Sequence, residues 1–96
     1  MKRPCVYILA NKVGGTLYPG VTSDLARRAW EHKCDAVDGF TKRYGVHMLV
    51  HVEFYETMLE AIEREKKLKR WRRAWKLDLI EKHNPKWKDL YDSIVK

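Results

Sequence analysis

The sequence contains little of what stabilises small secreted proteins or anchors proteins in membranes. Its 96 residues include two cysteines, three prolines and five glycines. Cys5 and Cys34 form no CxxC pair, and with no secretion signal we expect reduced packing residues rather than a disulfide or a metal site. The N-terminal apolar run, residues 5–10, is too short for a signal peptide, and no run of about 18 apolar residues exists to span a bilayer. These absences predict a cytoplasmic protein.

The length leaves room for one core. Hydrophobic residues make up 45% of the chain and aromatic residues 11%, and domains usually hold roughly 100–150 residues. The sequence shows no internal repeat and no low-complexity segment. We therefore expect residues 1–96 to form a single domain.

The formal net charge of +7 is concentrated in one segment. Residues 64–76 contain eight basic residues and one acid, Glu65, which leaves 12 basic and 12 acidic residues elsewhere from totals of 20 and 13. A local patch of this kind favours a polyanionic partner over a general solubility role. No recognition-helix or zinc-finger pattern occurs, so we expect contact with phosphates and little reading of bases. The candidate phosphate-binding residues are Lys42, Lys66, Lys69, Arg70 and Arg73.

Hydropathy patterns predict a small α/β fold. Residues 5–10 are apolar at every position, which is typical of a central strand covered on both faces. A Gly-containing turn leads to a second short strand at residues 16–18. Pro19 indicates that this second strand is an edge strand or ends there. A helix is expected at residues 24–33 and a third strand at 48–55. Thr57, with Glu60 in capping-box spacing, begins a long helix through the basic segment that stops at residues 84–85, and residues 87–94 fold back on the core. We expect a three-stranded, mainly antiparallel sheet flanked by helices.

One acid interrupts the apolar face of the long helix. Met58, Ala61, Ile62 and Leu68 form a stripe, and Glu65 stands at its centre, whereas Glu63 points away. A buried carboxylate needs a cation, a metal or a cluster of donors beside it. Periodicity alone leaves two interpretations open, a ligand-binding residue or a structural pair with a buried arginine.

Two polar residues lie on the inward face expected for the first helix. Arg28 and His32 share that face with Leu25 and Ala29, whereas Arg27 points to solvent. A single inward histidine is more often a satisfied core residue, but an inward arginine, histidine and glutamate together suit a phosphate and a divalent ion. Tyr7 and Tyr18 lie on the paired strands, where tyrosines are by default core or rim residues.

The ordered set of these residues resembles the GIY-YIG nuclease family, found in homing endonucleases and in the N-terminal part of the excinuclease subunit UvrC. The triplet Cys5-Val6-Tyr7 and the triplet Tyr18-Pro19-Gly20 correspond to its two motifs. Arg28 follows eight residues after the second glycine, His32 follows four further on, and Glu65 ends an E-A-x-x-x-E pattern that begins at Glu60. Residues 15–18, 21–25, 39–45 and 84–85 look like the small stand-alone bacterial members.

The resemblance implies a metal-dependent endonuclease that hydrolyses DNA phosphodiesters with low sequence specificity, structure-specific and related to repair. Glu65 would hold one Mg²⁺ or Mn²⁺, and Arg28 would grip the scissile phosphate. Tyr7 would accept the proton of the attacking water, with Tyr18 and His32 positioning water and phosphate. A tyrosine of pKa near ~10 is a poor base at neutral pH, so this role requires a neighbouring cation or metal.

One departure from the family pattern leaves an alternative open. Pro19 stands where the family usually has isoleucine, fixing φ and removing a backbone donor beside Tyr18. If it distorts the hairpin, the chain is a nucleic-acid-binding module without activity. A third interpretation is a protein-interaction module that uses Trp71, Trp75 and Trp87, although Trp71 and Trp75 are expected in the core.

Overall fold

The computed structural model describes residues 2–34 and 43–94, and its centre is a three-stranded antiparallel sheet. The strands are β1 (Cys5–Ala10), β2 (Leu17–Thr22) and β3 (Met48–Phe54), in the order β2-β1-β3. All six residues of β1 are buried, so the strand that the sequence predicts as central lies between the other two. The predicted α/β class and sheet are confirmed.

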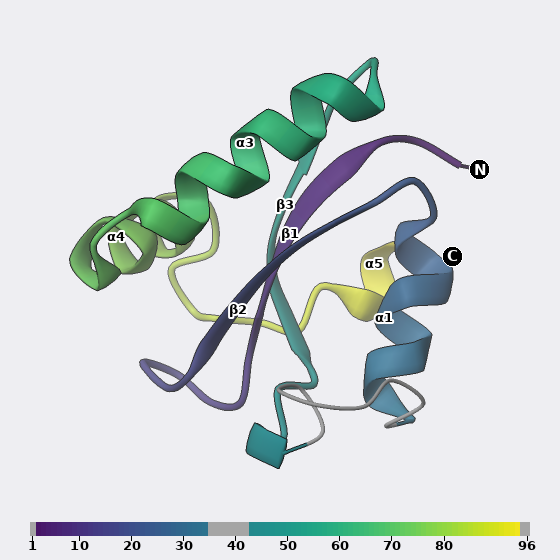
Figure 1. Ribbon diagram of the computed structural model, residues 1–96. Coiled ribbons are helices and arrows are strands. Elements are labelled where there is room, and N and C mark those ends of the chain that lie inside the picture. Colours follow the sequence, from purple (N-terminus) through teal and green to yellow (C-terminus); the bar gives the residue numbers. More distant parts are fainter. Residues whose placement is uncertain (1, 35–42, 95–96) are drawn as a thin grey trace.

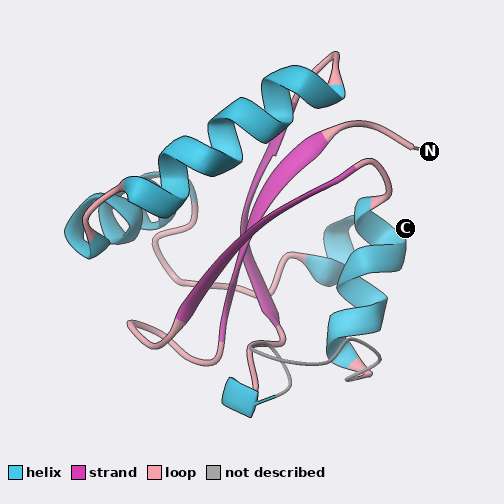
Figure 2. Cartoon of the chain, in the orientation of Figure 1, coloured by secondary structure: helices cyan, strands magenta, loops and turns pink. Residues whose placement is uncertain are grey.

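Helices cover both faces of this sheet (Figures 1 and 2). Helices α3 (Met58–Arg70) and α4 (Arg73–His83) lie over one face, where Val6, Ile8 and Ala10 form a cluster with Leu68 and Ile80. Helices α1 (Leu25–Lys33) and α5 (Tyr91–Ile94) lie over the other. There the core holds Cys5, Tyr7, Leu9, Leu25, Val46 and Leu49. Of the described helices, none is both long and apolar enough to cross a bilayer.

Strand β2 is longer than the sequence predicts. It continues through Pro19 to Thr22, and its pairing with β1 runs in register from Cys5↔Thr22 to Ala10↔Leu17, with Pro19 opposite Ile8. A proline fits an edge strand when its missing N–H belongs to the outward side. The hairpin is therefore regular at the residue that departs from the family pattern.

The capping box of α3 is present as predicted. The hydroxyl of Thr57 accepts a hydrogen bond from the Glu60 backbone N–H at 3.2 Å and donates to the Glu60 carboxylate at 3.0 Å. In α1 the cap is Asp24, whose carboxylate accepts the Arg27 N–H at 3.3 Å, so the helix begins at Leu25.

The prediction of one long helix through the basic segment is wrong, because the chain leaves the helix at Trp71. Trp71 has φ −63° and ψ 147°, and α4 begins two residues later. Half-buried Trp71 packs against the core, with the Arg64 guanidinium 4.8 Å from its ring centroid. After the break, α4 is placed so that Ile80 is buried in the same core, and a straight helix would lose this burial.

The tryptophans occupy three different environments. Trp87 is buried, Trp71 is half-buried, and Trp75 is 50% exposed and contacts Trp71 edge to face at 5.9 Å. The expectation that Trp75 lies in the core is wrong. Because Trp87 is buried, the three side chains do not form one exposed patch. Both cysteines are free thiols. Cys5 is buried, as expected of a packing residue, but Cys34 is exposed, so that expectation is wrong for Cys34.

Candidate active site

Tyr7 lies at the centre of the candidate site, and a glycine on the neighbouring strand makes room for its ring. Tyr7 pairs with Gly20 across β1 and β2. A Cβ at position 20 would lie 2.4 Å from both Cζ and the hydroxyl oxygen of Tyr7, so the ring lies directly against the backbone of β2. The glycine of the second motif is therefore required by close packing, and only the side-chain-free residue leaves space for the phenol.

The phenol reaches His32 of α1. The Tyr7 hydroxyl oxygen lies 3.3 Å from Nε2 of His32, and the rings of Tyr7 and Tyr18 lie 6.0 and 5.7 Å from the imidazole. His32 is 2% exposed, and its Nδ1 is the one buried side-chain polar atom of the described residues without a hydrogen-bond partner. Periodicity predicts this inward position of His32, and the structure brings the three rings together.

Burial sets the protonation states of this pair. Burial lowers the pKa of His32, and the Arg28 charge lowers it further, so the imidazole is neutral at neutral pH. Burial also raises the pKa of Tyr7 strongly, with a further increase from Tyr18 and Glu65 that the Arg28 charge opposes. The hydroxyl of Tyr7 therefore keeps its proton, and His32 is the available proton acceptor.

Arg28 lies at the rim of the site. Its side chain is 42% exposed, against 75% for Arg27. The sequence predicts an inward Arg28 and a solvated Arg27; the order is as expected, but Arg28 is only half-buried. Both arginines reach Glu31, with Nε to carboxylate distances of 3.6 Å. A half-exposed guanidinium beside Tyr7 and His32 is accessible to a phosphate from solvent.

Glu65 comes from the helix on the other face of the sheet. Its side chain is 13% exposed, as expected for its place in the apolar stripe, and its carboxylate pairs with Nζ of Lys69 at 2.9 Å. The hydrogen bond to Glu65 raises the pKa of Lys69, and the charge of Tyr18 raises it a little further. Beside the larger effect of burial, the Glu65 charge also raises the pKa of Tyr7. Helix α3 packs along β2 (Figure 1), and the charges of Glu65 and Arg28 both act on Tyr7 beside this edge strand.

The acid at this edge suits a metal that takes few protein ligands. Among residues 2–34 and 43–94, no group of three His, Cys, Asp or Glu side chains is close enough to enclose an ion. The partner of Glu65 is a lysine that is 54% exposed and able to move away, rather than the buried arginine of the structural interpretation. A single carboxylate completed by water is the kind of site that Mg²⁺ accepts.

The basic residues that the sequence predicts as phosphate contacts separate into different environments. Lys66 and Arg70 are exposed on α3, and Lys69 holds Glu65. Arg73 donates from one guanidinium nitrogen to the carbonyls of Gly14 and Gly15 at 2.6 Å, which ties α4 to the β1–β2 turn. Lys42 lies outside the described residues. Lysine and arginine spacing alone gives no sign of the Arg73 contact.

A second polar cluster, not predicted from the sequence, lies under α3. Glu53 of β3 accepts two hydrogen bonds from Arg64 at 2.8 and 3.1 Å, one from the Tyr55 hydroxyl at 2.8 Å, and contacts His51 Nε2 at 2.8 Å. Although burial opposes this, the hydrogen bonds lower the pKa of Glu53 well below its ordinary range. The available signal was the alternation of His51, Glu53 and Tyr55 on one strand face.

The chain is similar to known proteins in sequence and in fold. Residues 3–78 match the model of the GIY-YIG catalytic domain. A UPF0213 protein of Staphylococcus aureus is 41% identical over 68 residues, which are 70% of this chain and 82% of that protein. One from Staphylococcus saprophyticus is 34% identical over 80 residues, which are 83% and 96% of the two chains.

A solved structure shares the fold as well. The solution NMR structure of a UPF0213 protein from Bacillus halodurans matches with a TM-score of 0.58 at 28% sequence identity, over 91% of this chain and 92% of that one. The family model covers more than half of the sequence and includes both tyrosine motifs, Arg28, His32 and Glu65. The chain therefore belongs to the GIY-YIG family of nuclease domains.

Proposed function

We propose that this protein is a divalent-metal-dependent endonuclease that hydrolyses phosphodiester bonds of DNA with little sequence preference. One observation carries the proposal. On one face of the sheet, the Tyr7 hydroxyl lies 3.3 Å from Nε2 of a neutral, buried His32, and the charge of Arg28 influences both. From the helix on the other face, the largely buried carboxylate of Glu65 raises the pKa of the same tyrosine.

The proton of the attacking water leaves through Tyr7 and His32. With its pKa raised, Tyr7 does not act as a phenolate. Its hydroxyl passes its own proton to Nε2 of His32 while it accepts one from the water, which forms the new P–O bond. His32 then carries a positive charge that Glu31, whose charge raises the pKa of His32, helps to stabilise. The displaced oxygen takes its proton from solvent.

Arg28 and Glu65 serve the charge of the phosphate. The planar guanidinium of Arg28 binds two phosphate oxygens and holds the scissile group against Tyr7. Glu65 would hold Mg²⁺ or Mn²⁺, and Lys69 would then move away from the carboxylate. When bound, the ion supplies Lewis-acid stabilisation of the charge that develops on the phosphate.

The substrate preference follows from the exposed surface. Lys66 and Arg70 are exposed cations, and the sequence has no recognition-helix pattern, which together favour contact with the nucleic-acid backbone. We therefore propose branched, nicked or single-stranded DNA, as found in repair intermediates, as the substrate.

The test compares two neighbouring acids of α3. Labelled branched, nicked and single-stranded DNA is incubated with Mg²⁺ or Mn²⁺ and the wild-type protein, Glu65→Gln or Glu63→Gln. We expect wild-type cleavage and a loss of about 1,000-fold in Glu65→Gln, because the carboxylate charge is removed without a change of shape. Exposed Glu63 is the matched control and should keep full activity. Equal activity of Glu65→Gln and wild type contradicts the assignment.

The alternative, a binding module without activity, depends on a hairpin distorted by Pro19. The register of β1 and β2 continues through that residue, which removes the reason to prefer it. Binding of DNA that weakens steeply with salt, without product under any metal, would restore it.

A further inference from the structure

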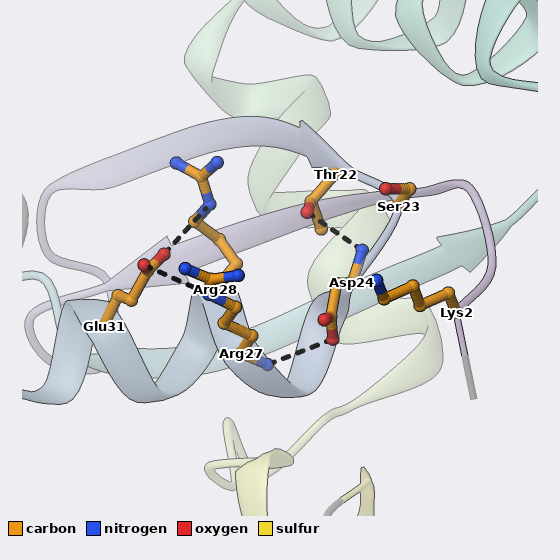
Figure 3. A pocket seen from close by; sticks show the side chains of 7 residues that line it. All are labelled: Lys2, Thr22, Ser23, Asp24, Arg27, Arg28 and Glu31. Atoms are coloured by element: carbon orange, nitrogen blue, oxygen red, sulfur yellow. Dashed lines mark hydrogen bonds and ion pairs between the residues drawn. The ribbon is translucent and has the colours of Figure 1, made fainter.

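A cavity opens at the start of α1, beside the candidate site. Its volume is about 270 Å³, close to the lower limit of roughly 300 Å³ for sites that bind small molecules. It is lined by residues of β2, of α1 and of the N-terminal segment, and Figure 3 shows their side chains. They are Lys2, Thr22, Ser23, Asp24, Arg27, Arg28 and Glu31.

The lining restricts the ligand to a charged, hydrated group. Every lining residue is polar or charged, so the cavity offers no aromatic or aliphatic wall on which a nucleobase would stack. Three of the residues are cations, Lys2, Arg27 and Arg28, and two are acids. The hydroxyls of Thr22 and Ser23 add short donors. This composition fits a phosphate group and excludes an apolar ligand.

The two acids leave the cations available to a ligand. Asp24 accepts a hydrogen bond from the backbone N–H of Arg27 and so caps α1. An anion in the cavity would therefore be attracted by the side chains and not by the N-terminus of the helix. Glu31 meets Arg27 and Arg28 at Nε, at 3.6 Å each (Figure 3). A guanidinium has five N–H donors, so the four terminal ones of each arginine are not used by these contacts with Glu31.

Arg28 connects this cavity to the candidate active site. Its guanidinium lines the cavity, and its charge acts on both Tyr7 and His32. We infer that Lys2 and Arg27, with Thr22 and Ser23, bind the phosphodiester next to the scissile one on the same strand. The inference rests on the proposed function and adds a second phosphate subsite to it, in which Arg27 is a binding residue that fixes the path of the strand.

The experiment compares ligands with one and two phosphates, without metal so that no cleavage occurs. A thymidine dinucleotide has one phosphate and a trinucleotide has two, and each is titrated by NMR into wild type, Arg27→Gln and Lys82→Gln. We expect the second phosphate to raise wild-type affinity about tenfold, since charge-assisted hydrogen bonds are formed. The gain should fall to about twofold in Arg27→Gln. Only the trinucleotide should shift the Arg27 Nε–Hε signal.

The control removes the same charge elsewhere. Lys82 is exposed on α4, on the other side of the sheet from α1, and its variant should keep the wild-type gain. Because Arg27 is 75% exposed, we expect both variants to fold normally. A gain in Arg27→Gln equal to that of wild type overturns the inference, and so does absence of the gain in wild type.

Two further arms separate the sources of a phosphate and the two proposals. If inorganic phosphate shifts the Arg27 signal as strongly as the trinucleotide does, the cavity binds free phosphate and the inference is overturned. A labelled twelve-nucleotide strand is tested for binding and for cleavage with Mg²⁺. If it is bound and cleaved while the trinucleotide shows no Arg27-dependent gain, only the inference fails. If it is neither bound nor cleaved, the proposed function fails with it.

Discussion

The molecule contains the same four residue types in two places, with opposite arrangements. Under α3, Glu53, His51, Tyr55 and Arg64 bond to one another, and the carboxylate contacts the other three. Around the edge of β2, Tyr7 contacts His32, but Glu65 and Arg28 pair with other residues. Glu65 holds exposed Lys69, Arg28 meets Glu31, and Nδ1 of His32 has no partner among the described residues.

This contrast distinguishes a structural cluster from a binding site. Polar groups that satisfy one another stabilise the fold and have no remaining capacity for a ligand. Groups with weak or exchangeable partners are less stabilising and stay available. Residue type alone does not separate the two clusters, whereas the hydrogen-bond partners do. Substitutions in both clusters test this difference.

The largest effect is expected for Glu53→Gln. Removing the charge leaves Arg64 half-buried without its carboxylate, and we expect a loss of about 2–3 kcal/mol in the free energy of unfolding. Glu65→Gln should change it by less than about 0.5 kcal/mol, because its partner is exposed. Urea denaturation at neutral pH measures both. Equal losses would show that the two clusters do not differ.

The Glu53 cluster also predicts a dependence on pH. Its folded-state pKa lies below the ordinary value of 4.5. The carboxylate therefore contributes its full stabilisation above about pH 4.5, and the contribution is lost as the pH falls toward the folded-state pKa. In Glu53→Gln this loss should be absent.

Gly20→Ala tests the cluster at the edge of β2 by changing the packing around Tyr7. The new Cβ would lie 2.4 Å from the Tyr7 hydroxyl and Cζ, so the buried ring has to shift, which disturbs its contact with His32. We expect a loss of about 1–3 kcal/mol in stability, as for other overpacked sites, and slower cleavage. In a Tyr7→Phe background, where the hydroxyl is already absent, Gly20→Ala should slow cleavage little further. Independent effects of the two changes would contradict the proton path.

The protonation state of His32 predicts a smaller effect on rate. Its pKa lies below the ordinary value of 6.5, so the neutral form predominates at neutral pH and above. Cleavage should stay level with respect to this group above about pH 6.5 and fall, by about tenfold per pH unit, below the folded-state pKa. His32→Gln should be slower at pH 7 and lack this acid limb. An unchanged acid limb in His32→Gln would assign it to another group.

The smallest effect is expected for Lys69→Met. Removing the ammonium leaves the Glu65 carboxylate without its competing cation, and we expect Mn²⁺ to bind several-fold more tightly, a change of about 1 kcal/mol. Mn²⁺ titration followed by electron paramagnetic resonance measures the affinity directly. Lys66→Met, an equal loss of charge on the exposed side of α3, is the control. Weaker binding in Lys69→Met would show that the lysine is not a competitor.

Sequence patterns predict the parts of this molecule that depend on local periodicity. The uninterrupted apolar residues of β1 indicate a central strand, and the polar residue in the α3 stripe indicates Glu65. Both follow from the residue itself and its near neighbours. Arg28 is only half-buried because helical spacing predicts the direction of a side chain but not its depth.

Features that depend on distant contacts were not predictable in this way. No glycine or proline marks the end of α3 at Trp71, and the break follows from the packing of α4 on the core. Arg73 belongs to the same basic segment as Lys66, but its guanidinium binds carbonyls 58 and 59 positions away. The four-residue cluster of Glu53 likewise requires α3 to lie beside β3, which no single segment reveals.

Pro19 has a consequence for encounters between copies of this chain. An edge strand displays backbone donors and acceptors that a strand of another molecule can pair with, which is a common route to aggregation. The proline in the middle of β2 removes one of those donors. The same edge borders Tyr18 and Gly20, so a second sheet docking there would cover the candidate site. The proline therefore disfavours pairing of another strand with β2 and leaves this edge accessible to a nucleic acid.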